Sequence, residues 1–351
     1  MPVSDYDYDL PRALIAQEPI ARGHSRLLTL LRDQAPAHRN IRDLPALLDP
    51  GDLLVVNNTR VIAARLFGRR PGGGRSEILL VEPRRPRRAV QEAVDWICLG
   101  HPRKRMRPGT RLRFSGGLLG KVVDHLEPDR LRIRFSDPPA PLLEHIGHVP
   151  LPPYISRPDS PADRERYQTV YAEVPGAIAA PTAGLHFDRE LLDAIGARGV
   201  EIAKITLHVG PGTFRPIASD DIEGHRMEAE RYEIDGETAT ALERACKRGG
   251  RVIAVGTTVV RALEAAALAG DGRVEARGDS TDLFIKPGFE FRVVDRLLTN
   301  FHLPRSTLLV LVCALAGRER LIESYRQAVG SGYRFYSYGD AMLIDRAAPG
   351  E

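Results

Sequence analysis

The sequence predicts a mixed α/β protein in which a larger α/β domain is interrupted by a small antiparallel β domain. Strand and helix patterns alternate along residues 190–268, which is typical of strands connected by helices. From residue 66 to residue 148, short strands separated by Gly, Pro and Arg clusters follow one another instead. With 351 residues and 43% hydrophobic composition, the chain is long enough for both domains.

The first strands are expected within residues 51–68. A buried strand pattern there is followed by the polar tetrad Asn57, Asn58, Thr59 and Arg60 and then by a second strand pattern. Polar residues between two β-branched runs form a turn, because Asn bonds to its own backbone, or they form a ligand site. The sequence leaves both interpretations of the tetrad open.

The interrupting domain is predicted to be a small antiparallel β-barrel, with a sandwich as the alternative. We place it at residues 67–148, so that residues 1–66 and 149–351 together form one discontinuous α/β domain. Its five expected strands are Glu77–Val81, Val94–Leu99, Arg111–Phe114, Leu118–Asp124 and Leu131–Phe135.

After this insertion the helix and strand patterns resume. Helices are expected at residues 190–198, 237–248, 259–268 and 308–316, and strands at residues 201–207 and 251–255. The last strand runs into Gly256, Thr257 and Thr258 at a helix start. Free N–H groups and the positive end of the helix dipole could hold an anion there, although a plain N-cap explains the threonines equally well.

The predicted barrel is strongly basic. Residues 69–113 contain 13 Arg or Lys against four acids, on a chain whose formal net charge is only +4. Such a block is the footprint expected for a nucleic-acid partner, and Arg103, Lys104, Arg105 and Arg107 are its candidate RNA-binding residues. A solvated charged loop is the alternative, because arginine is favoured throughout this chain.

Three histidines share one local setting. His186, His208 and His302 each lie between apolar residues, and the first two also lie beside glycine turns. A histidine there could move protons near neutral pH, whereas a single buried histidine is more often bonded to backbone carbonyls. The wide spacing between the three lacks the paired ligands of zinc motifs, so no metal site is predicted.

Several classes of protein are disfavoured by the sequence. It contains no Gly-x-Gly-x-x-Gly leading into a helix and no P-loop, which argues against a Rossmann or P-loop nucleotide site. The acidic N-terminus lacks a secretory pattern, and the longest apolar run, residues 308–316, is too short to span a membrane. Three scattered cysteines fit a reducing compartment. We therefore expect a cytoplasmic protein without a membrane partner.

Taken in order, a set of segments resembles the S-adenosylmethionine:tRNA ribosyltransferase-isomerase family of queuosine biosynthesis. The resemblance runs nearly end to end. The segments are residues 9–16, 51–60, 150–155, 167–171, 180–187, 206–210, 255–258, 299–304 and 338–342. One departure is at His225-Arg-Met-Glu228-Ala-Glu230, where the family usually has a second histidine at the position of Glu228.

The resemblance implies an unusual transferase reaction. Members of the family transfer the ribosyl part of S-adenosylmethionine to 7-aminomethyl-7-deazaguanine in the tRNA anticodon and isomerise it, giving epoxyqueuosine, adenine and methionine. S-adenosylmethionine is then a consumed co-substrate, and no other cofactor is expected. The implied partner is the anticodon stem-loop of tRNA, and the chain is expected to be a monomer.

The candidate site residues follow from this reaction and from the local patterns. His186, His208 and Glu230 are the candidate catalytic residues. The candidate substrate-binding residues are Asn57, Asn58, Thr59, Arg60, Thr182, Gly184, Gly210, Thr213, Gly256, Thr257, Thr258, Arg261, Asn300, His302 and Asp340. The alternative functions are an S-adenosylmethionine-dependent RNA methyltransferase and a non-catalytic RNA-binding protein.

Overall fold

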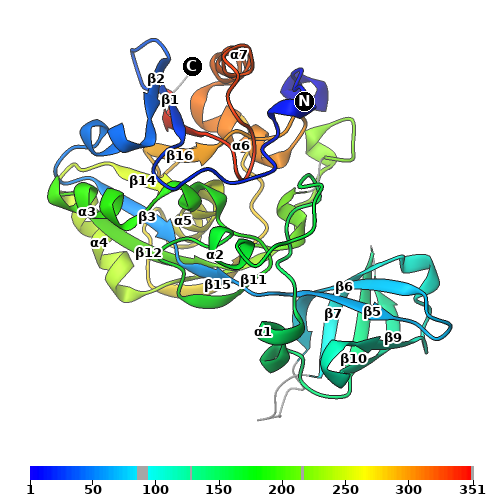
Figure 1. Ribbon diagram of the computed structural model, residues 1–351. Helices are drawn as coiled ribbons and strands as arrows, with labels where there is room; N and C mark the ends of the chain where they lie inside the picture. Colours follow the sequence, from blue (N-terminus) through cyan, green and yellow to red (C-terminus); the bar gives the residue numbers. More distant parts are fainter. Residues whose placement is uncertain (85–93, 127–128, 215–216, 349–351) are drawn as a thin grey trace. The chain divides into compact units, whose positions relative to one another are not determined.

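The larger of two structural units is built on a nine-stranded sheet (Figure 1). A computed structural model describes residues 1–84, 94–126, 129–214 and 217–348. The larger unit comprises Met1–Arg60, Pro152–Arg157 and Arg166–Glu351, and the smaller unit comprises Val61–Leu151 and Pro158–Glu165.

The sheet combines a parallel centre with antiparallel edges. In spatial order its strands are β15 (Arg277–Thr281), β13 (Glu230–Ile234), β12 (Glu201–Leu207), β3 (Leu53–Asn57), β14 (Val252–Val255), β16 (Arg296–Asn300), β17 (Ala341–Asp345), β1 (Arg26–Leu30) and β2 (Ala37–Asn40). Strands β12, β3, β14 and β16 run parallel to one another, while β17 is antiparallel to β16. The four parallel strands therefore end at the same edge of the sheet.

Both faces of the sheet are covered by helices. In β3, Leu53 and Val55 belong to one hydrophobic cluster and Leu54 and Val56 to the other, because successive side chains of a strand point to opposite faces. The first cluster packs against α4 (Gly236–Lys247), α5 (Thr257–Ala269), α6 (Thr307–Ala316) and α7 (Arg318–Gly330). The second packs against α3 (Arg189–Ala197) and the 3₁₀ helix η3 (Ile41–Leu47).

The helix ends have identifiable causes. Asp188 accepts a hydrogen bond from the N–H of Leu191 in α3, and Ser306 does the same for Leu309 in α6. Gly317, with φ of 82°, ends α6. The start of α5 differs, because Gly256 precedes it and has no side chain to cap it. The free N–H groups at this end become important for the site.

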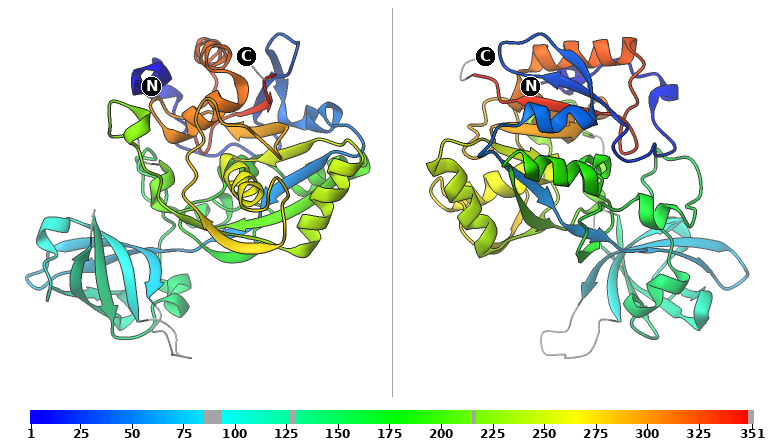
Figure 2. Two further views of the ribbon diagram at one scale, coloured as in Figure 1. Left: turned by 180° about the vertical axis from the view of Figure 1, so that it is seen from behind. Right: turned by 60° about the vertical axis from the view of Figure 1, so that its left-hand side comes forward.

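The smaller unit is a closed antiparallel barrel, seen from two further sides in Figure 2. Around the barrel the strands are β10 (Arg130–Phe135), β7 (Asp95–His101), β6 (Arg75–Arg84), β5 (Arg65–Arg69), β8 (Arg111–Phe114) and β9 (Leu119–Leu126). Alternate residues such as Ile78, Cys98 and Ile133 fill its interior. The predicted fold class, a larger α/β domain with an inserted small antiparallel β-barrel domain, is confirmed.

One barrel strand was predicted as a strand but not as part of the barrel. Five barrel strands were expected, and β5 is the sixth; it overlaps the second strand pattern of residues 51–68 and crosses the boundary placed between residues 66 and 67. Its real partners are β6 and β8, which are distant in the sequence and which local patterns do not reveal.

The remaining described elements are short. They are η1 (Val3–Tyr6), η2 (Arg12–Leu14), β4 (Thr59–Val61), η4 (Arg103–Arg105), η5 (Ser115–Gly117), η6 (Ala140–Leu142), α1 (Leu143–Ile146), α2 (Asp163–Arg166), β11 (Val174–Ala177), η7 (Thr182–His186), η8 (Pro211–Phe214) and η9 (Ile222–Gly224). In the part of the chain that the structure describes, no helix is long and apolar enough to cross a membrane.

The packing of the barrel interior predicts that position 68 tolerates only glycine. A Cβ atom there would lie 2.8 Å from the Phe114 ring and 3.0 Å from the carbonyl oxygen of Arg113. Gly68→Ala should therefore lower the free energy of unfolding of the barrel by about 1–3 kcal/mol. Because Trp96 is the single tryptophan and lies in β7, its fluorescence during urea titration reports barrel unfolding selectively.

Gly278→Ala provides the matched control. Gly278 also lies in a strand, β15, but a Cβ atom there meets nothing within 4 Å. An unchanged Trp96 transition in Gly68→Ala would contradict the tight contact described here.

Candidate functional site

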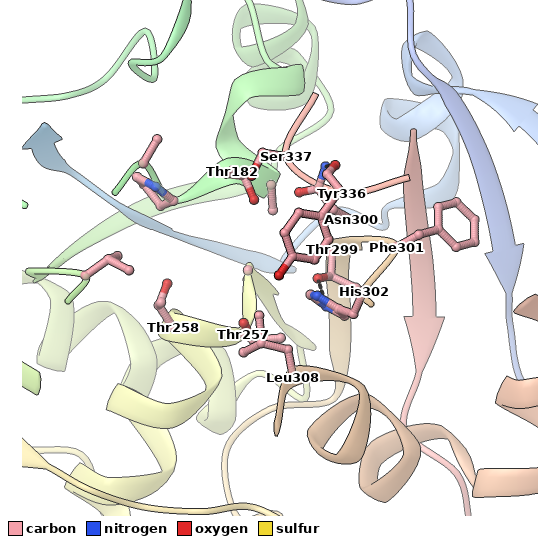
Figure 3. A pocket seen from close by; sticks show the side chains of 15 residues that line it. Thr182, Thr257, Thr258, Thr299, Asn300, Phe301, His302, Leu308, Tyr336 and Ser337 are labelled. Carbon is pink, nitrogen blue, oxygen red and sulfur yellow. Dashed lines mark hydrogen bonds between the residues drawn. The ribbon is translucent and has the colours of Figure 1, made fainter. Parts of the chain in front are cut away.

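A cavity whose wall includes several polar side chains lies at the carboxyl ends of β14 and β16, the edge where ligands commonly bind in parallel sheets (Figure 3). Its walls come from η7, the start of α5, the residues that follow β16 and a loop before β17. Six of the predicted substrate-binding residues line it, namely Thr182, Gly256, Thr257, Thr258, Asn300 and His302.

Strand pairing brings two of these segments together. Val255 of β14 lies opposite Leu298 of β16, and the N–H of Gly256 donates to the carbonyl oxygen of Leu298 at 2.8 Å. Gly256 has φ of 95°, which favours glycine, and the chain then turns directly into α5. The first N–H groups of α5 have no partner within the helix and form the positive end of its dipole.

The Asn300 carboxamide is fixed by two hydrogen bonds. Its Nδ2 donates to the carbonyl oxygen of Tyr336 at 3.1 Å and lies 3.0 Å from Nε2 of His186. A carbonyl oxygen only accepts, so the first bond fixes which end of the amide is the nitrogen. The Asn300 Oδ1 atom is buried and has no hydrogen-bond partner among the described residues. One acceptor in the cavity wall is therefore unsatisfied.

Thr258 contributes a second unsatisfied group. Its Oγ1 atom is also buried without a hydrogen-bond partner in the described residues, although the side chain lines the cavity. Buried polar atoms are nearly always paired, because an unpaired one costs about 1–3 kcal/mol. Two such atoms in one cavity indicate a place for a polar ligand.

His186 holds the Asn300 carboxamide in place by a hydrogen bond. The Asn300 Nδ2–H donates to Nε2 of His186, so the proton of this imidazole is on Nδ1, which lies 2.6 Å from Oγ of Ser25. Burial lowers the pKa of His186 to about 4. The ring is therefore neutral near pH 7, and both of its nitrogens already have partners. This arrangement holds a neighbouring side chain in place and leaves no lone pair for a substrate.

His302 is the histidine that lines the cavity directly. Its Nε2 lies 3.0 Å from Oγ1 of Thr299, and its backbone N–H donates to the Tyr325 hydroxyl at 3.1 Å. Burial lowers its pKa to about 3, so the ring is neutral but only weakly basic. The sequence indicated a substrate contact at His302, and the structure places the ring on the cavity wall.

His208 has a different environment from the other two. Thr59 Oγ1 lies 2.8 Å from Nδ1 of His208 and 3.4 Å from the carbonyl oxygen of Val174. Nε2 of His208 has no hydrogen-bond partner among the described residues. Burial, together with the nearby Arg231, lowers the pKa of His208, so the ring is a neutral base near pH 7. His208 is half-buried and directly precedes Val209, which lines the cavity.

Glu230 and Arg261 form a buried ion pair beside the cavity. Arg261 Nη1 contacts Glu230 Oε2, and Arg261 also donates to the carbonyl oxygens of Leu283 and Thr281. Glu230 Oε1 accepts from the N–H of Gly210 at 2.8 Å. The pair therefore fixes the loop after β12. Neither residue lines the cavity, and the catalytic role of Glu230 stays a prediction.

The polar tetrad after β3 bonds within the protein. Asn57 accepts from the N–H groups of Thr59 and Leu207 and donates to the carbonyl oxygen of Leu207. Asn58 bonds Glu173 and Thr206, and Arg60 donates to the carbonyl oxygen of Ala172. The tetrad is no turn, because Asn57 ends β3 and Thr59 begins β4; its contacts join β3 to β12 and its neighbouring loop. A ligand contact by the tetrad stays a prediction. Thr59 is the member that reaches a candidate base.

Other predicted residues also have structural partners. The space beside Gly184 is filled by the Tyr171 hydroxyl, 2.1 Å from where a Cβ atom would be. Asp340 is buried and paired with Arg26, and it accepts from the N–H of Arg334. The Thr213 side chain lies outside the described residues.

Tyr336 lines the cavity but was not among the predicted site residues. Tyr336 has φ of 76°, a conformation that is rare for a bulky residue and that clusters at functional sites. Its carbonyl oxygen accepts from Asn300, and its N–H donates to the carbonyl oxygen of Phe301. No local sequence pattern predicts a positive φ at a tyrosine. The only signal for Tyr336 was that it lies two residues before the segment 338–342, which resembles the family.

The predicted RNA-binding residues lie on the barrel. Arg103, Lys104 and Arg105 form η4, and Arg107 follows in the next turn. Lys104, Arg105 and Arg107 are exposed, while Arg103 is half-buried. Their exposure suits either a polyanion contact or a solvated loop, so their role stays a prediction.

Comparisons with known proteins identify related chains. A model of the family described as queuosine biosynthesis protein matches residues 3–344. Proteins named S-adenosylmethionine:tRNA ribosyltransferase-isomerase are similar, at 51% identity in Anaeromyxobacter sp. (99% of this chain, 100% of the relative) and 53% in Gloeobacter violaceus (97% and 94%). A crystal structure of the S-adenosylmethionine tRNA ribosyltransferase from Thermotoga maritima matches with 38% identity and a TM-score of 0.55, covering 97% of this chain and all of that one.

The buried histidines predict a pH dependence of folding. In the unfolded chain their pKa is about 6.5, above the folded values, so the unfolded state binds more protons as the pH falls. Stability is therefore fully present above about pH 6.5 and is lost as the pH falls towards 4. Urea unfolding followed by circular dichroism at several pH values should show this decline.

His302→Gln isolates one contribution to this decline. The glutamine amide keeps a polar group near Thr299 but does not titrate, so the variant should lose less stability between pH 6.5 and 4 than the wild type. An equal loss in both proteins would contradict a neutral buried His302.

Proposed function

The chain belongs to the queuosine biosynthesis family of S-adenosylmethionine:tRNA ribosyltransferase-isomerases, and from this premise we propose that the cavity at the ends of β14 and β16 binds S-adenosylmethionine. The observation that carries the proposal is the pair of unsatisfied buried atoms, Asn300 Oδ1 and Thr258 Oγ1. They lie beside the uncapped start of α5. Together these groups offer an acceptor, a hydroxyl and an anion-binding helix end.

The parts of S-adenosylmethionine match these groups. Its carboxylate suits the N–H groups at Thr257 and Thr258, where the helix dipole favours negative charge. A ribose hydroxyl or an amine of the ligand suits Asn300 Oδ1, which only accepts. The sulfonium suits the aromatic ring of Tyr336, because cations are attracted to ring faces.

The reaction requires one strong proton acceptor. The sulfonium acidifies the adjacent ribose carbon, so removal of a proton there allows adenine to leave. The aminomethyl group of the modified base in tRNA then attacks the ribosyl carbon, methionine leaves, and the epoxide closes. S-adenosylmethionine is consumed in this sequence, and no regenerated cofactor takes part.

His208 is the base in this proposal. A general base needs a free lone pair and a pKa not far from the working pH. His186 lacks the first, because Asn300 and Ser25 occupy its nitrogens. His302 lacks the second, because burial lowers its pKa to about 3. His208 has the first, with Thr59 accepting from Nδ1–H so that Nε2 carries the lone pair, and its ring is less buried than those of His186 and His302.

The anticodon stem-loop of tRNA is the proposed nucleic-acid substrate, and a monomer in the cytoplasm is the proposed working form. The three cysteines, Cys98, Cys246 and Cys313, are free thiols, in keeping with a reducing compartment. The methyltransferase and the non-catalytic RNA-binding alternatives are both disfavoured by the ribosyltransferase-isomerase names of full-length relatives.

Product analysis tests the activity. With S-adenosylmethionine labelled in the ribose and an anticodon stem-loop carrying the aminomethyl base, label should enter the RNA while adenine and methionine are released. Parallel reactions with methyl-labelled S-adenosylmethionine should leave the RNA unlabelled. Methyl transfer, or no transfer of either label, would refute the proposed activity.

Two variants test the cavity by isothermal titration with S-adenosylmethionine. Asn300→Leu removes the acceptor and Thr258→Val removes the hydroxyl, so each should raise the Kd for S-adenosylmethionine about ten-fold. Thr240→Val, on the exposed side of α4, is the matched control and should bind normally. Wild-type affinity in both cavity variants would place the ligand elsewhere.

Separate variants distinguish the histidines. His208→Ala should reduce kcat at least 100-fold with little change in S-adenosylmethionine affinity, because the base acts only in the chemical step. His186→Ala should instead weaken S-adenosylmethionine binding, because Asn300 loses a partner that holds it. Isothermal titration and single-turnover rates measure the two effects, and a normal rate for His208→Ala would remove His208 from the mechanism.

A further inference from the structure

Three arginines are direct cross-strand neighbours on the outside of the barrel. Arg69 of β5 lies opposite Arg75 of β6 on one side and opposite Arg113 of β8 on the other. All three are exposed, because their neighbours Gly68 and Phe114 point into the barrel. We call Arg75, Arg69 and Arg113 the arginine row.

The arginine row has no acidic partner among the described residues. In the described part of the chain, none of the three forms an ion pair, and the nearby acid Glu77 is bound to Arg65 at 3.0 Å. Elsewhere on the barrel arginines are paired, as Arg134 is with Asp95. Like charges directly opposite each other destabilise a sheet. Repulsion between these arginines therefore destabilises the barrel locally, and a bound anion would relieve it.

Exposed apolar side chains flank the arginine row. Phe67, two residues before Arg69 in β5, is 48% exposed, and Leu119, opposite Arg113, is also 48% exposed. Only five large hydrophobic residues of the described chain are exposed, and the two most exposed of them lie beside the same row.

The row and Phe67 share one surface hollow. Its volume is about 820 Å³, and Phe67, the three arginines, Glu77 and His101 are among the residues that line it. The hollow lies within the smaller unit. The rings of Phe67 and His148 meet in a T-shaped contact, with centroids 4.8 Å apart and planes at 70°. The positively charged hollow thus contains an aromatic side chain that is held by a ring contact.

We propose that this face of β5, β6 and β8 binds the RNA substrate, with the arginine row on backbone phosphates and Phe67 stacked on an unpaired base. This inference rests on the proposed function, because that function makes tRNA the substrate. Single-stranded nucleic acid is commonly held by a basic groove combined with aromatic stacking platforms. Guanidinium groups suit phosphates because they donate two parallel hydrogen bonds. The surface differs from Arg103–Arg107, the contact that the sequence predicted.

Direct binding measurements test the surface. With the full chain and a fluorescent anticodon stem-loop, Phe67→Ala should raise the Kd about ten-fold, because one stacked base is lost. The triple variant R69Q/R75Q/R113Q should weaken binding more and should reduce the slope of log K against log salt by about two. Leu268→Ala and Arg326→Gln, at exposed positions of the larger unit, are the matched controls and should bind as the wild type.

A stability measurement separates binding from a structural role. Because the triple variant removes repulsion, its Trp96 unfolding transition should be unchanged or shifted to higher urea, while RNA binding falls. Unchanged RNA affinity in the triple variant and in Phe67→Ala would overturn the proposal. The proposal would also be overturned if polyglutamate displaced the labelled stem-loop as well as unlabelled RNA does, since a site that binds any polyanion does not need an aromatic contact from Phe67.

The design distinguishes this inference from the proposed function. Binding is measured without S-adenosylmethionine, so the surface is tested even if no ribosyl transfer occurs. If transfer occurs, the variants should show a raised KM for RNA, an unchanged kcat and an unchanged affinity for S-adenosylmethionine. A lowered kcat at saturating RNA with an unchanged KM would assign these residues to another step and overturn the proposal.

Discussion

The parallel pairing of β14 with β16 is the constraint on which the candidate site depends. Because of this pairing, both strands end at one edge of the sheet. The hydrogen bond from the N–H of Gly256 to the carbonyl oxygen of Leu298 fixes the register between their ends. The start of α5 and the Asn300 carboxamide therefore meet across one cavity, although they are distant in the sequence. If the register shifted by one residue, Asn300 would point to the other face and the acceptor would leave the cavity.

Around this edge the protein keeps its imidazoles neutral by burial. A neutral His186 accepts from Asn300, and a protonated one could only donate, which would set two N–H groups against each other. The neutral state is therefore required for the orientation of Asn300. The same condition suits a site for a sulfonium, because a nearby imidazolium would repel the positive ligand. Under the proposed mechanism, low basicity at His186 and His302 favours binding of the sulfonium, and proton removal falls to the less buried His208.

The sequence predicted those features that local patterns encode. The helices with side-chain caps at Asp188 and Ser306 were found to within two residues, and six predicted residues line the cavity. Features set by tertiary contacts were missed. Strand β5 was not assigned to the barrel because its partners are remote, and the conformation of Tyr336 depends on bonds to Phe301 and Asn300. Nor could the sequence show that the three histidines differ, because each difference lies in a partner from another segment.

Arginine serves two opposite purposes in this chain. Arg261 is buried, so it must be paired, and Glu230 and two carbonyl oxygens satisfy it. The arginine row is exposed, so water keeps its unpaired charges tolerable while they remain available to a ligand. Only five of the 50 basic residues are lysine, so a preference for arginine explains the residue type. It does not explain three charges on adjacent strands that form no ion pair within residues 1–84, 94–126, 129–214 and 217–348. Neighbouring strands are about 4.8 Å apart, so the row spans about 10 Å, enough for long side chains to reach successive phosphates of one strand.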